Sequence, residues 1–345
     1  MTGSDREEKM TEIGNRADVP FTERYIDLHL HLDGALTAGI ARKLAALQNI
    51  PLPADDAALE KLLTVQPDCA DLNEFLARFL LPISLLQTPE ALSEAVRLVS
   101  DEVKEHGVVY AELRFAPQSH TLGGMTQEDA VLAALNGLKK TELKANLILC
   151  CMRGVGNEAQ NLETVELARK YLVEDGGVVA VDLAGAEALF PTADYQRLFD
   201  KVREYGIPFT IHAGEADGPE SVRQAVEFGA SRIGHGVTIF QDPEVVRLVK
   251  DRGIVLEMCP TSNRQTHAVP DMADYPFMSY LGAGLKVTLN TDDPAIEGTT
   301  LAGEYRYMEK TFGLTAAQEK ILLANAIDAA FTTDAVKARL REMLL

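Results

Sequence analysis

Four short motifs contain the residues whose types and spacing could do chemistry. They are HLHLDG at 29–34, HAGE at 212–215, GHG at 234–236 and NTDDP at 290–294. Each motif comes at the end of an apolar run of the kind that forms β-strands. Together they supply three imidazoles and a carboxylate for one metal ion, and a further imidazole and carboxylate for proton chemistry beside it.

The first motif places two histidines on one face of a strand. Residues two apart in a strand share a face, so His29 and His31 are expected to point the same way, with Asp27 behind them on that face. A pair of hydrogen-bonded core histidines would show the same H-x-H spacing. This motif alone therefore leaves both interpretations open.

Three further candidates, His212, His235 and Asp292, end other apolar runs and favour the metal interpretation. Nitrogen and oxygen ligands without thiolate suit zinc, although iron, cobalt and manganese remain alternatives. Three or four protein ligands with room for water are typical of a catalytic metal site. The run 178–185 contains no lysine that could be modified to bridge two metals, so we expect one metal ion per chain.

Two other acids lie close to these candidates. Glu215 follows His212 by three positions and is expected to reach the same pocket. The alternative is a helix N-cap or a first-turn helix charge. Asp293 adjoins Asp292 and, by strand alternation, would point to the opposite side. The alternative is a turn residue before Pro294.

The remaining polar residues of interest are interpreted as structural. Glu112 and Arg114 share a face of one run and are expected to form an internal ion pair. His267 is expected to be a surface residue in a loop, and no role is assigned to His106 or His120.

The elements that must position these groups are eight apolar runs with helical segments between them. The runs are YIDLHLH (25–31), VVYAELRFAP (108–117), NLILCC (146–151), VVAVDLAG (178–185), FTIHAG (209–214), SRIGHG (231–236), IVLEMCP (254–260) and LKVTLNTDD (285–293). This alternation predicts an α/β fold of the (β/α)8 TIM-barrel type, in which active sites lie at the strand C-termini. Strands and helices also alternate in a doubly wound sheet. That fold is disfavoured because no glycine-rich phosphate loop follows the first run.

The connection between the first two runs, from about 37 to 107, is long enough for several helices. It contains an apolar helical segment, DLNEFLARFLLPISLL (71–86). This insertion is predicted either to act as a lid over the site or to pack as an outer helix on the barrel. From about 315 onward the chain is predicted to be helical and to close the structure.

Composition limits the partners and the compartment. A net charge of −19 argues against nucleic acid or anionic membranes as partners, because their phosphates attract Lys and Arg. The four cysteines form no C-x-x-C pair, which fits a reducing, cytoplasmic setting. Residues 1–20 are polar and lack a signal-peptide pattern, so we expect a disordered tail followed by a single domain over 21–345.

At this point the sequence resembles the adenosine deaminase family from about residue 24 to residue 330. The motifs HLHLDGAL, AELRFAP, DLAG, HAGE, IGHG, CPTSN and NTDDP occur in the family's order, and as a set they are highly specific. The resemblance implies a (β/α)8 barrel with one zinc ion. It also implies that His29, His31, His212 and Asp292 are the zinc ligands.

The resemblance further assigns the proton chemistry. Glu215 corresponds to the acid that protonates purine N1, and His235 to the residue that orients and supports the attacking hydroxide. Asp293 corresponds to the partner of N7, Gly185 to the glycine whose N–H meets N3, and Asp33 to a ribose-hydroxyl contact.

Four apolar residues match lid positions that close over the substrate: Leu72, Phe75, Leu76 and Phe79. Their i, i+3, i+4, i+7 spacing is also that of any buried helix face, so a core role is an equal alternative. His31 would also border the substrate. One departure is Ala186, where the family often has an acid.

The resulting hypothesis is a zinc-dependent enzyme that deaminates adenosine, and 2′-deoxyadenosine, to inosine and ammonia. The alternative substrates are adenine and 5′-modified adenosines. Resembling adenine deaminases usually have Glu where this chain has Asp33, which favours a nucleoside. A catalytically inactive barrel that binds a nucleoside or a protein is a further alternative, against which Glu215 and His235 speak.

Overall fold

The computed structural model describes residues 21–65 and 75–345. The predicted tail at 1–20 and part of the predicted lid, including Leu72, lie outside the described residues. The described chain contains eight strands: β1 (Tyr25–His31), β2 (Val108–Phe115), β3 (Lys144–Met152), β4 (Val178–Ala184), β5 (Thr210–Ala213), β6 (Arg232–His235), β7 (Val255–Met258) and β8 (Lys286–Leu289). Each strand lies within, or within two residues of, one predicted run.

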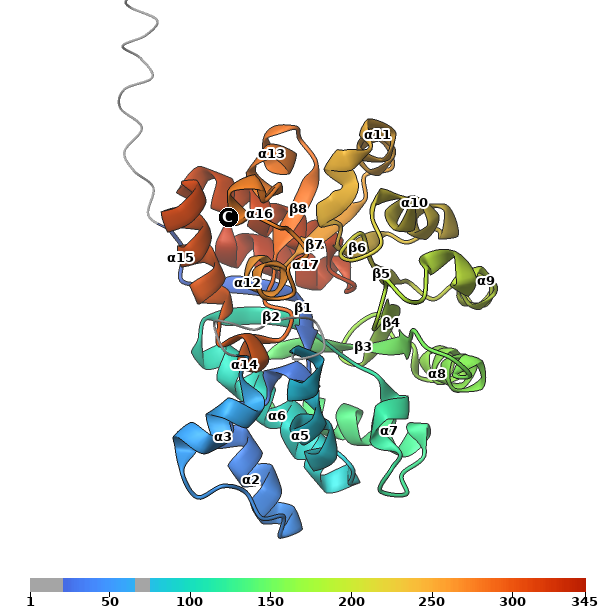
Figure 1. Ribbon diagram of the computed structural model, residues 1–345, viewed down its shortest axis with the longest axis vertical. Coiled ribbons are helices and arrows are strands. Elements are labelled where there is room, and N and C mark those ends of the chain that lie inside the picture. Colours follow the sequence, from blue (N-terminus) through green and yellow to red (C-terminus); the bar gives the residue numbers. More distant parts are fainter. Residues whose placement is uncertain (1–20, 66–74) are drawn as a thin grey trace, which may run out of the picture.

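The strands form one closed parallel barrel. Two four-stranded sheets run β1-β2-β3-β4 and β5-β6-β7-β8. Parallel bridges join them at both edges, Leu30 with Asp292 and Val181 with Phe209. The helices surround the strands, as Figure 1 shows, and the predicted (β/α)8 fold is confirmed. All strand C-termini therefore meet at one end.

Helices of 4 to 17 residues surround the barrel. They are α2 (Ala38–Gln48), α3 (Asp56–Leu63), α5 (Leu80–Leu85), α6 (Pro89–Glu105), α7 (Gln127–Leu138), α8 (Glu158–Tyr171), α9 (Gln196–Glu204), α10 (Pro219–Phe228), α11 (Pro243–Asp251), α12 (Pro260–Gln265), α13 (Phe277–Gly282), α14 (Pro294–Glu297), α15 (Leu301–Phe312), α16 (Ala316–Ala329) and α17 (Asp334–Leu344). Short 3-10 turns lie between them: η1 (Asp33–Ala35), η2 (Ala77–Phe79), η3 (Pro117–His120), η4 (Thr192–Tyr195), η5 (Val237–Gln241) and η6 (Met272–Asp274).

Local sequence sets several helix ends. The Thr88 side chain accepts a hydrogen bond from the Ala91 N–H and caps α6, while Pro89 occupies its first turn. Helix α10 also begins at a proline, and Gly229 caps its C-terminus. The φ of Gly229 is +98°, a left-handed conformation that glycine adopts without strain. The described part of the 71–86 segment is not one continuous helix, because a 3-10 turn (η2) precedes the short helix α5.

A β-bulge in β1 changes the expected direction of one side chain. Asp27 pairs with Ala111 and Leu30 pairs with Leu113, so two residues of β1 lie opposite the single residue between those partners. Asp27 consequently lines a cavity outside the strands, between α6 and α15. The prediction that Asp27 shares a face with His29 is wrong, because the extra residue shifts the alternation.

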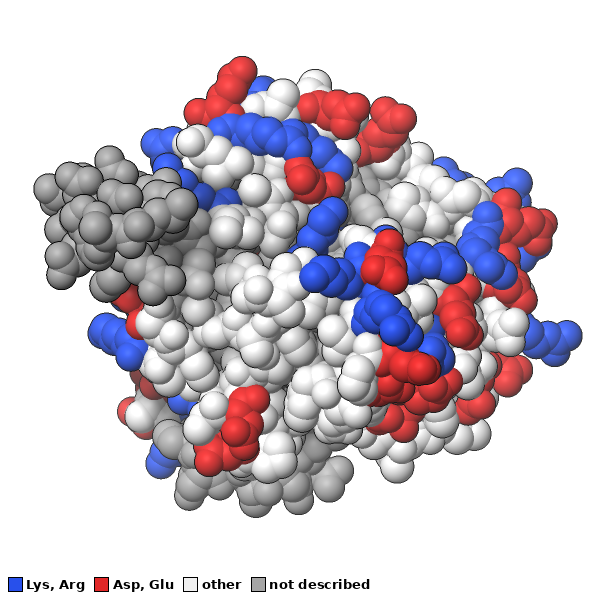
Figure 2. All heavy atoms as spheres, turned by 90° about the horizontal axis from the view of Figure 1, so that it is seen from above, with Lys and Arg blue, Asp and Glu red and all other residues white. Residues whose placement is uncertain are grey.

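The segment after α16 seals the N-terminal end of the barrel. The Phe331 ring lies 3.9 Å from the Arg232 guanidinium carbon, its N–H donates to Glu112, and its carbonyl accepts from Asn146. The prediction that the C-terminal stretch closes the structure is therefore confirmed. On the face seen in Figure 2, basic and acidic side chains are intermingled, without a separate basic patch. Among the described residues, no helix combines the length and apolar character needed to cross a membrane.

Candidate active site

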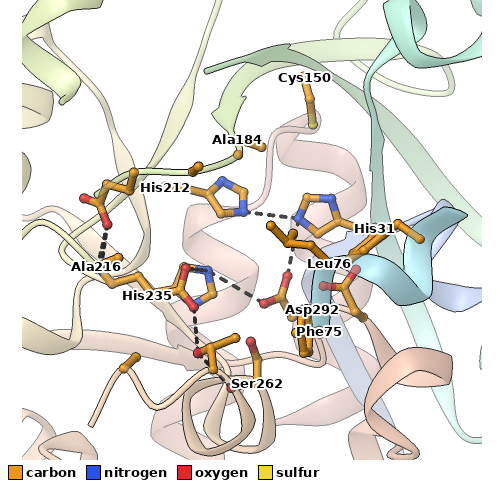
Figure 3. A pocket seen from close by; sticks show the side chains of 18 of the residues that line it. His31, Phe75, Leu76, Cys150, Ala184, His212, Ala216, His235, Ser262 and Asp292 are labelled. Atoms are coloured by element: carbon orange, nitrogen blue, oxygen red, sulfur yellow. Dashed lines mark hydrogen bonds and ion pairs between the residues drawn. The ribbon is translucent and has the colours of Figure 1, made fainter. Parts of the chain in front are cut away.

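Four predicted ligands converge at the C-terminal end of the barrel. The Nε2 atoms of His29 and His31 each lie 3.1 Å from Nε2 of His212. They also lie 3.1 and 3.3 Å from Oδ1 of Asp292. Figure 3 shows His31, His212 and Asp292 pointing toward one another.

This spacing fits a metal ion. Ligands about 2.0 Å from a tetrahedral centre are separated by roughly 3.3 Å, close to the observed distances. Three imidazole nitrogens and a carboxylate oxygen that face one another can hold a cation between them. His31 suits this role because burial lowers its pKa well below the usual range, which leaves the imidazole neutral.

Buried carboxylates orient two of the imidazoles. Nδ1 of His29 donates to Glu257 at 2.8 Å, and Nδ1 of His212 lies 2.9 Å from Asp182. These bonds place the ring protons on Nδ1 and leave both Nε2 atoms free for a metal. Burial alone would raise the pKa of Asp182, but His212 and Arg114 hold it well below its usual range.

The buried charges at the barrel interior pair differently from the prediction. Arg114 binds Asp182 at 3.0 Å and Glu257 at 2.9 Å, whereas Glu112 binds Arg232 at 2.7 Å. The expected Glu112–Arg114 ion pair is therefore wrong. Strands that are not adjacent to β2 supply these partners across the barrel interior. The interpretation of both residues as structural stands.

A cavity of about 760 Å³ opens beside the ligands and is large enough for a small molecule. Most predicted site residues that the structure describes line it: His31, Asp33, Phe75, Leu76, Phe79, Gly185, His212, Glu215, His235, Asp292 and Asp293. His29 is fully buried behind them. His267, predicted as a surface residue, is exposed but also lies at the rim of the cavity.

Glu215 and His235 face each other next to the ligands. Oε2 of Glu215 lies 3.6 Å from Nε2 of His235, which in turn lies 3.7 Å from Oδ2 of Asp292. Glu215 lies in the loop ahead of α10, which begins at Pro219, and Thr266 donates to its Oε1 at 3.1 Å. Glu215 therefore lines the cavity from this loop and is not a first-turn residue of α10.

Asn263, which the sequence interpretation missed, orients His235. The Tyr275 hydroxyl donates to Oδ1 of Asn263 at 3.1 Å, so the amide nitrogen faces Nδ1 of His235 at 3.1 Å. His235 Nδ1 then accepts, and its Nε2–H points toward Asp292 and Glu215. His235 and Asp292 both have positive φ, +64° and +74°, a strained conformation that clusters at functional sites.

Asp293 faces the cavity, contrary to strand alternation. Strand β8 ends at Leu289, and the positive φ of Asp292 turns the chain, so adjacent carboxylates both reach the cavity. Burial, reinforced by Asp292 and Asp33, raises the pKa of Asp293 well above its usual value. A carboxyl group that stays protonated can donate a hydrogen bond. Burial also raises the pKa of Asp33 to about 6.

Two glycines make room for these groups. A Cβ on Gly34 would come within 1.8 Å of Oδ1 of Asp293, and one on Gly234 would come within 2.9 Å of the His29 ring. The glycines in HLDG and GHG therefore permit the close packing of the acidic and imidazole groups.

Comparisons with known proteins show the family of this chain. The family model for adenosine deaminase matches residues 25–345. An adenosine deaminase from Haemophilus ducreyi is 51% identical over 91% of this chain and 94% of its own length. This chain belongs to the adenosine deaminase family.

Two solved structures of related chains share the fold. An adenine deaminase from Arthrobacter aurescens has a TM-score of 0.84 and 28% identity, covering 94% of this chain and 98% of that chain. The N6-methyl-AMP deaminase from Arabidopsis thaliana has a TM-score of 0.80 and 26% identity, covering 93% of this chain and 96% of that chain.

Proposed function

We propose that this protein is a zinc-dependent hydrolase that deaminates adenosine and 2′-deoxyadenosine to inosine and ammonia. The observation that carries the proposal is the convergence of His29, His31, His212 and Asp292 at a cavity that also contains Glu215, His235 and Asp293. A zinc ion held there would make hydroxide available at neutral pH. We expect one ion per chain.

The chain's own residues would then do the proton chemistry. Attack at C6 breaks the aromaticity of the purine, so N1 must gain a proton, which Glu215 would donate. The Nε2–H of His235 would hold the attacking oxygen beside Asp292 and stabilise its developing charge. Protonated Asp293 would donate to N7, and the Gly185 N–H to N3.

The cavity favours an uncharged nucleoside. Asp33 would bind a ribose hydroxyl, and Phe75, Leu76 and Phe79 would cover the substrate as part of a lid. No Lys or Arg is found among the described residues that line the cavity, so a 5′-phosphate would meet carboxylates without a counter-charge. Adenine and 5′-modified adenosines remain the alternative substrates.

We also propose a cytoplasmic location and residues 21–345 as one catalytic domain. The three described cysteines, Cys150, Cys151 and Cys259, are free and buried, as expected in a reducing compartment. The partner is a small molecule. Nucleic acid and membranes are not expected, given a net charge of −19.

The test is one ammonia-release assay run in parallel on adenosine, 2′-deoxyadenosine, adenine, 5′-AMP and a 5′-modified adenosine. The proposal expects rapid release from the two nucleosides and little from adenine or 5′-AMP. Release from adenine alone would mean that the substrate is the free base and not a nucleoside. Release from none of them would support the inactive-barrel alternative.

A further inference from the structure

A buried carboxylate outside the predicted set holds the loop that carries Glu215. Both oxygens of Glu187 accept backbone hydrogen bonds, from the N–H groups of Gly214 at 2.6 Å, Glu215 at 3.0 Å and Ala216 at 2.7 Å. The hydroxyl of Ser221, in α10, also donates to it. Glu187 is only 3% exposed, and its four donors come from elements that follow it by 27 to 34 residues.

The loop is fixed from its other side as well. The carbonyl of Gly214 accepts from both the N–H and the hydroxyl of Thr238, at 3.1 and 2.8 Å. Gly214 has a φ of +71°, and a Cβ there would lie 2.5 Å from Val222. Glu187 on one side and Thr238 on the other therefore leave the backbone at Glu215 little freedom to move.

Glu187 also ties this loop to the one that follows β4. It lies two residues after Gly185, whose φ is +102° and which lines the cavity. Arg153 reinforces the link, because it donates to the Thr192 hydroxyl at 2.9 Å and to the His212 carbonyl at 2.6 Å. The hydroxyl of Thr192 in turn pairs with that of Ser221 at 2.7 Å.

We propose that Glu187 is a positioning residue that sets the distance between the proton donor Glu215 and the backbone N–H of Gly185. This inference rests on the proposed function, in which these two groups bind N1 and N3 of the same purine ring. The ring is rigid, so a shift of either loop would misplace the acid relative to N1. A misplacement of about 1 Å can cost roughly 10²-fold in rate.

The test is Glu187→Gln, which keeps the shape but replaces one acceptor oxygen by an amide that faces backbone N–H groups. We expect kcat for adenosine to fall about 10²-fold, with a much smaller change in KM, because the acid and not the bulk of the pocket is displaced. Metal content should stay at the wild-type value. In a Glu215→Gln background the same substitution should cost almost nothing further, since its effect passes through Glu215.

The matched control is Glu319→Gln. Glu319 is also a buried carboxylate that accepts a backbone N–H, from Thr22 at 2.9 Å, but it does not line the cavity. The kcat of Glu319→Gln should stay near the wild-type value. If Glu187→Gln does not fold, Ser221→Ala removes one donor to the same carboxylate and should lower kcat several-fold.

The proposal would be overturned by wild-type kcat in either Glu187→Gln or Ser221→Ala. It would also be overturned if the Glu187 and Glu215 effects were additive, or if activity fell only in step with lost metal. A wild-type enzyme that releases no ammonia from adenosine would contradict the proposed function instead, so the two failures are distinguishable.

Discussion

The barrel interior and the cavity mouth both hold buried charges, but they pair them differently. In the interior, Arg114 and Arg232 lie between Glu112, Asp182 and Glu257, and each carboxylate contacts a guanidinium. At the mouth, carboxylates gather around imidazoles without any Lys or Arg among the described lining residues. The interior charges have their partners in the chain, whereas we propose that the mouth charges take a cation and a substrate as theirs. The interior charges hold the fold and orient the imidazoles of His29 and His212, whereas we propose that the mouth charges act on the substrate.

Removal of the metal should have the largest effect. Dialysis against a chelator should abolish ammonia release, because the ligand set at the mouth lacks its cation, and added Zn²⁺ should restore it. Far-ultraviolet circular dichroism should change little, since the interior ion pairs remain. Full activity in the metal-free protein would mean that the charges at the mouth do not need a cation, which would contradict the comparison with the interior.

Glu215→Gln should lower kcat by roughly 10²- to 10⁴-fold, the range for loss of a general acid. Metal content and the urea midpoint should stay near wild type, because no guanidinium or ammonium in the described part of the chain pairs with Glu215. Glu220→Gln, an exposed glutamate of the adjoining helix that contacts Arg223, is the matched control and should keep full activity. If Glu215→Gln kept most of its turnover, Glu215 would not be the general acid.

Arg114→Met tests the interior. It leaves Asp182 and Glu257 buried without their shared partner, which should lower the free energy of unfolding by about 3–5 kcal/mol in urea denaturation. Arg42→Met, which breaks a partly exposed pair with Asp56, should cost about 1 kcal/mol or less. Equal losses in the two variants would mean that burial does not distinguish these pairs.

Gly34→Ala tests the close packing at the mouth. The added methyl would overlap the Asp293 carboxyl, so we expect a several-fold loss in kcat/KM for adenosine. Gly39→Ala is the control, because a Cβ there meets nothing closer than 3.9 Å and α2 gains helix propensity. If both variants behave alike, the Gly34–Asp293 contact does not position the substrate.

The smallest expected effect is on the way the stability of the fold depends on pH. Burial raises the pKa of Glu304 to about 7, despite hydrogen bonds from Thr261 and Thr299 and the nearby Arg264. A raised folded-state pKa stabilises the fold fully below the unfolded value near 4.5, and this contribution is lost as pH rises through 7. The urea midpoint should therefore fall less between pH 4.5 and 7.5 in Glu304→Gln than in wild type. An identical pH dependence would contradict the raised pKa.

The sequence was sufficient to predict the barrel and to predict that most of the candidate site residues lie together. Apolar runs locate the strands, and the fold itself brings strand C-termini together, so His29, His212 and Asp292 could be placed near one another without coordinates. The family resemblance added the roles that we propose for Glu215 and Asp293.

The rest depends on contacts between distant segments. The bulge that turns Asp27 outward follows from pairing with β2 and leaves no local signal. Glu187 stands in the DLAGAE motif, yet its role depends on N–H groups of a different loop. Arg114 could not be paired correctly, because register between strands decides which buried carboxylate it meets.

The most direct test of the account is anomalous X-ray diffraction at the zinc edge from crystals of the purified protein. We predict a single peak about 2.0–2.2 Å from Nε2 of His29, His31 and His212 and from a carboxylate oxygen of Asp292. A second peak within 4 Å, or no peak among these four residues in a catalytically active preparation, would contradict it.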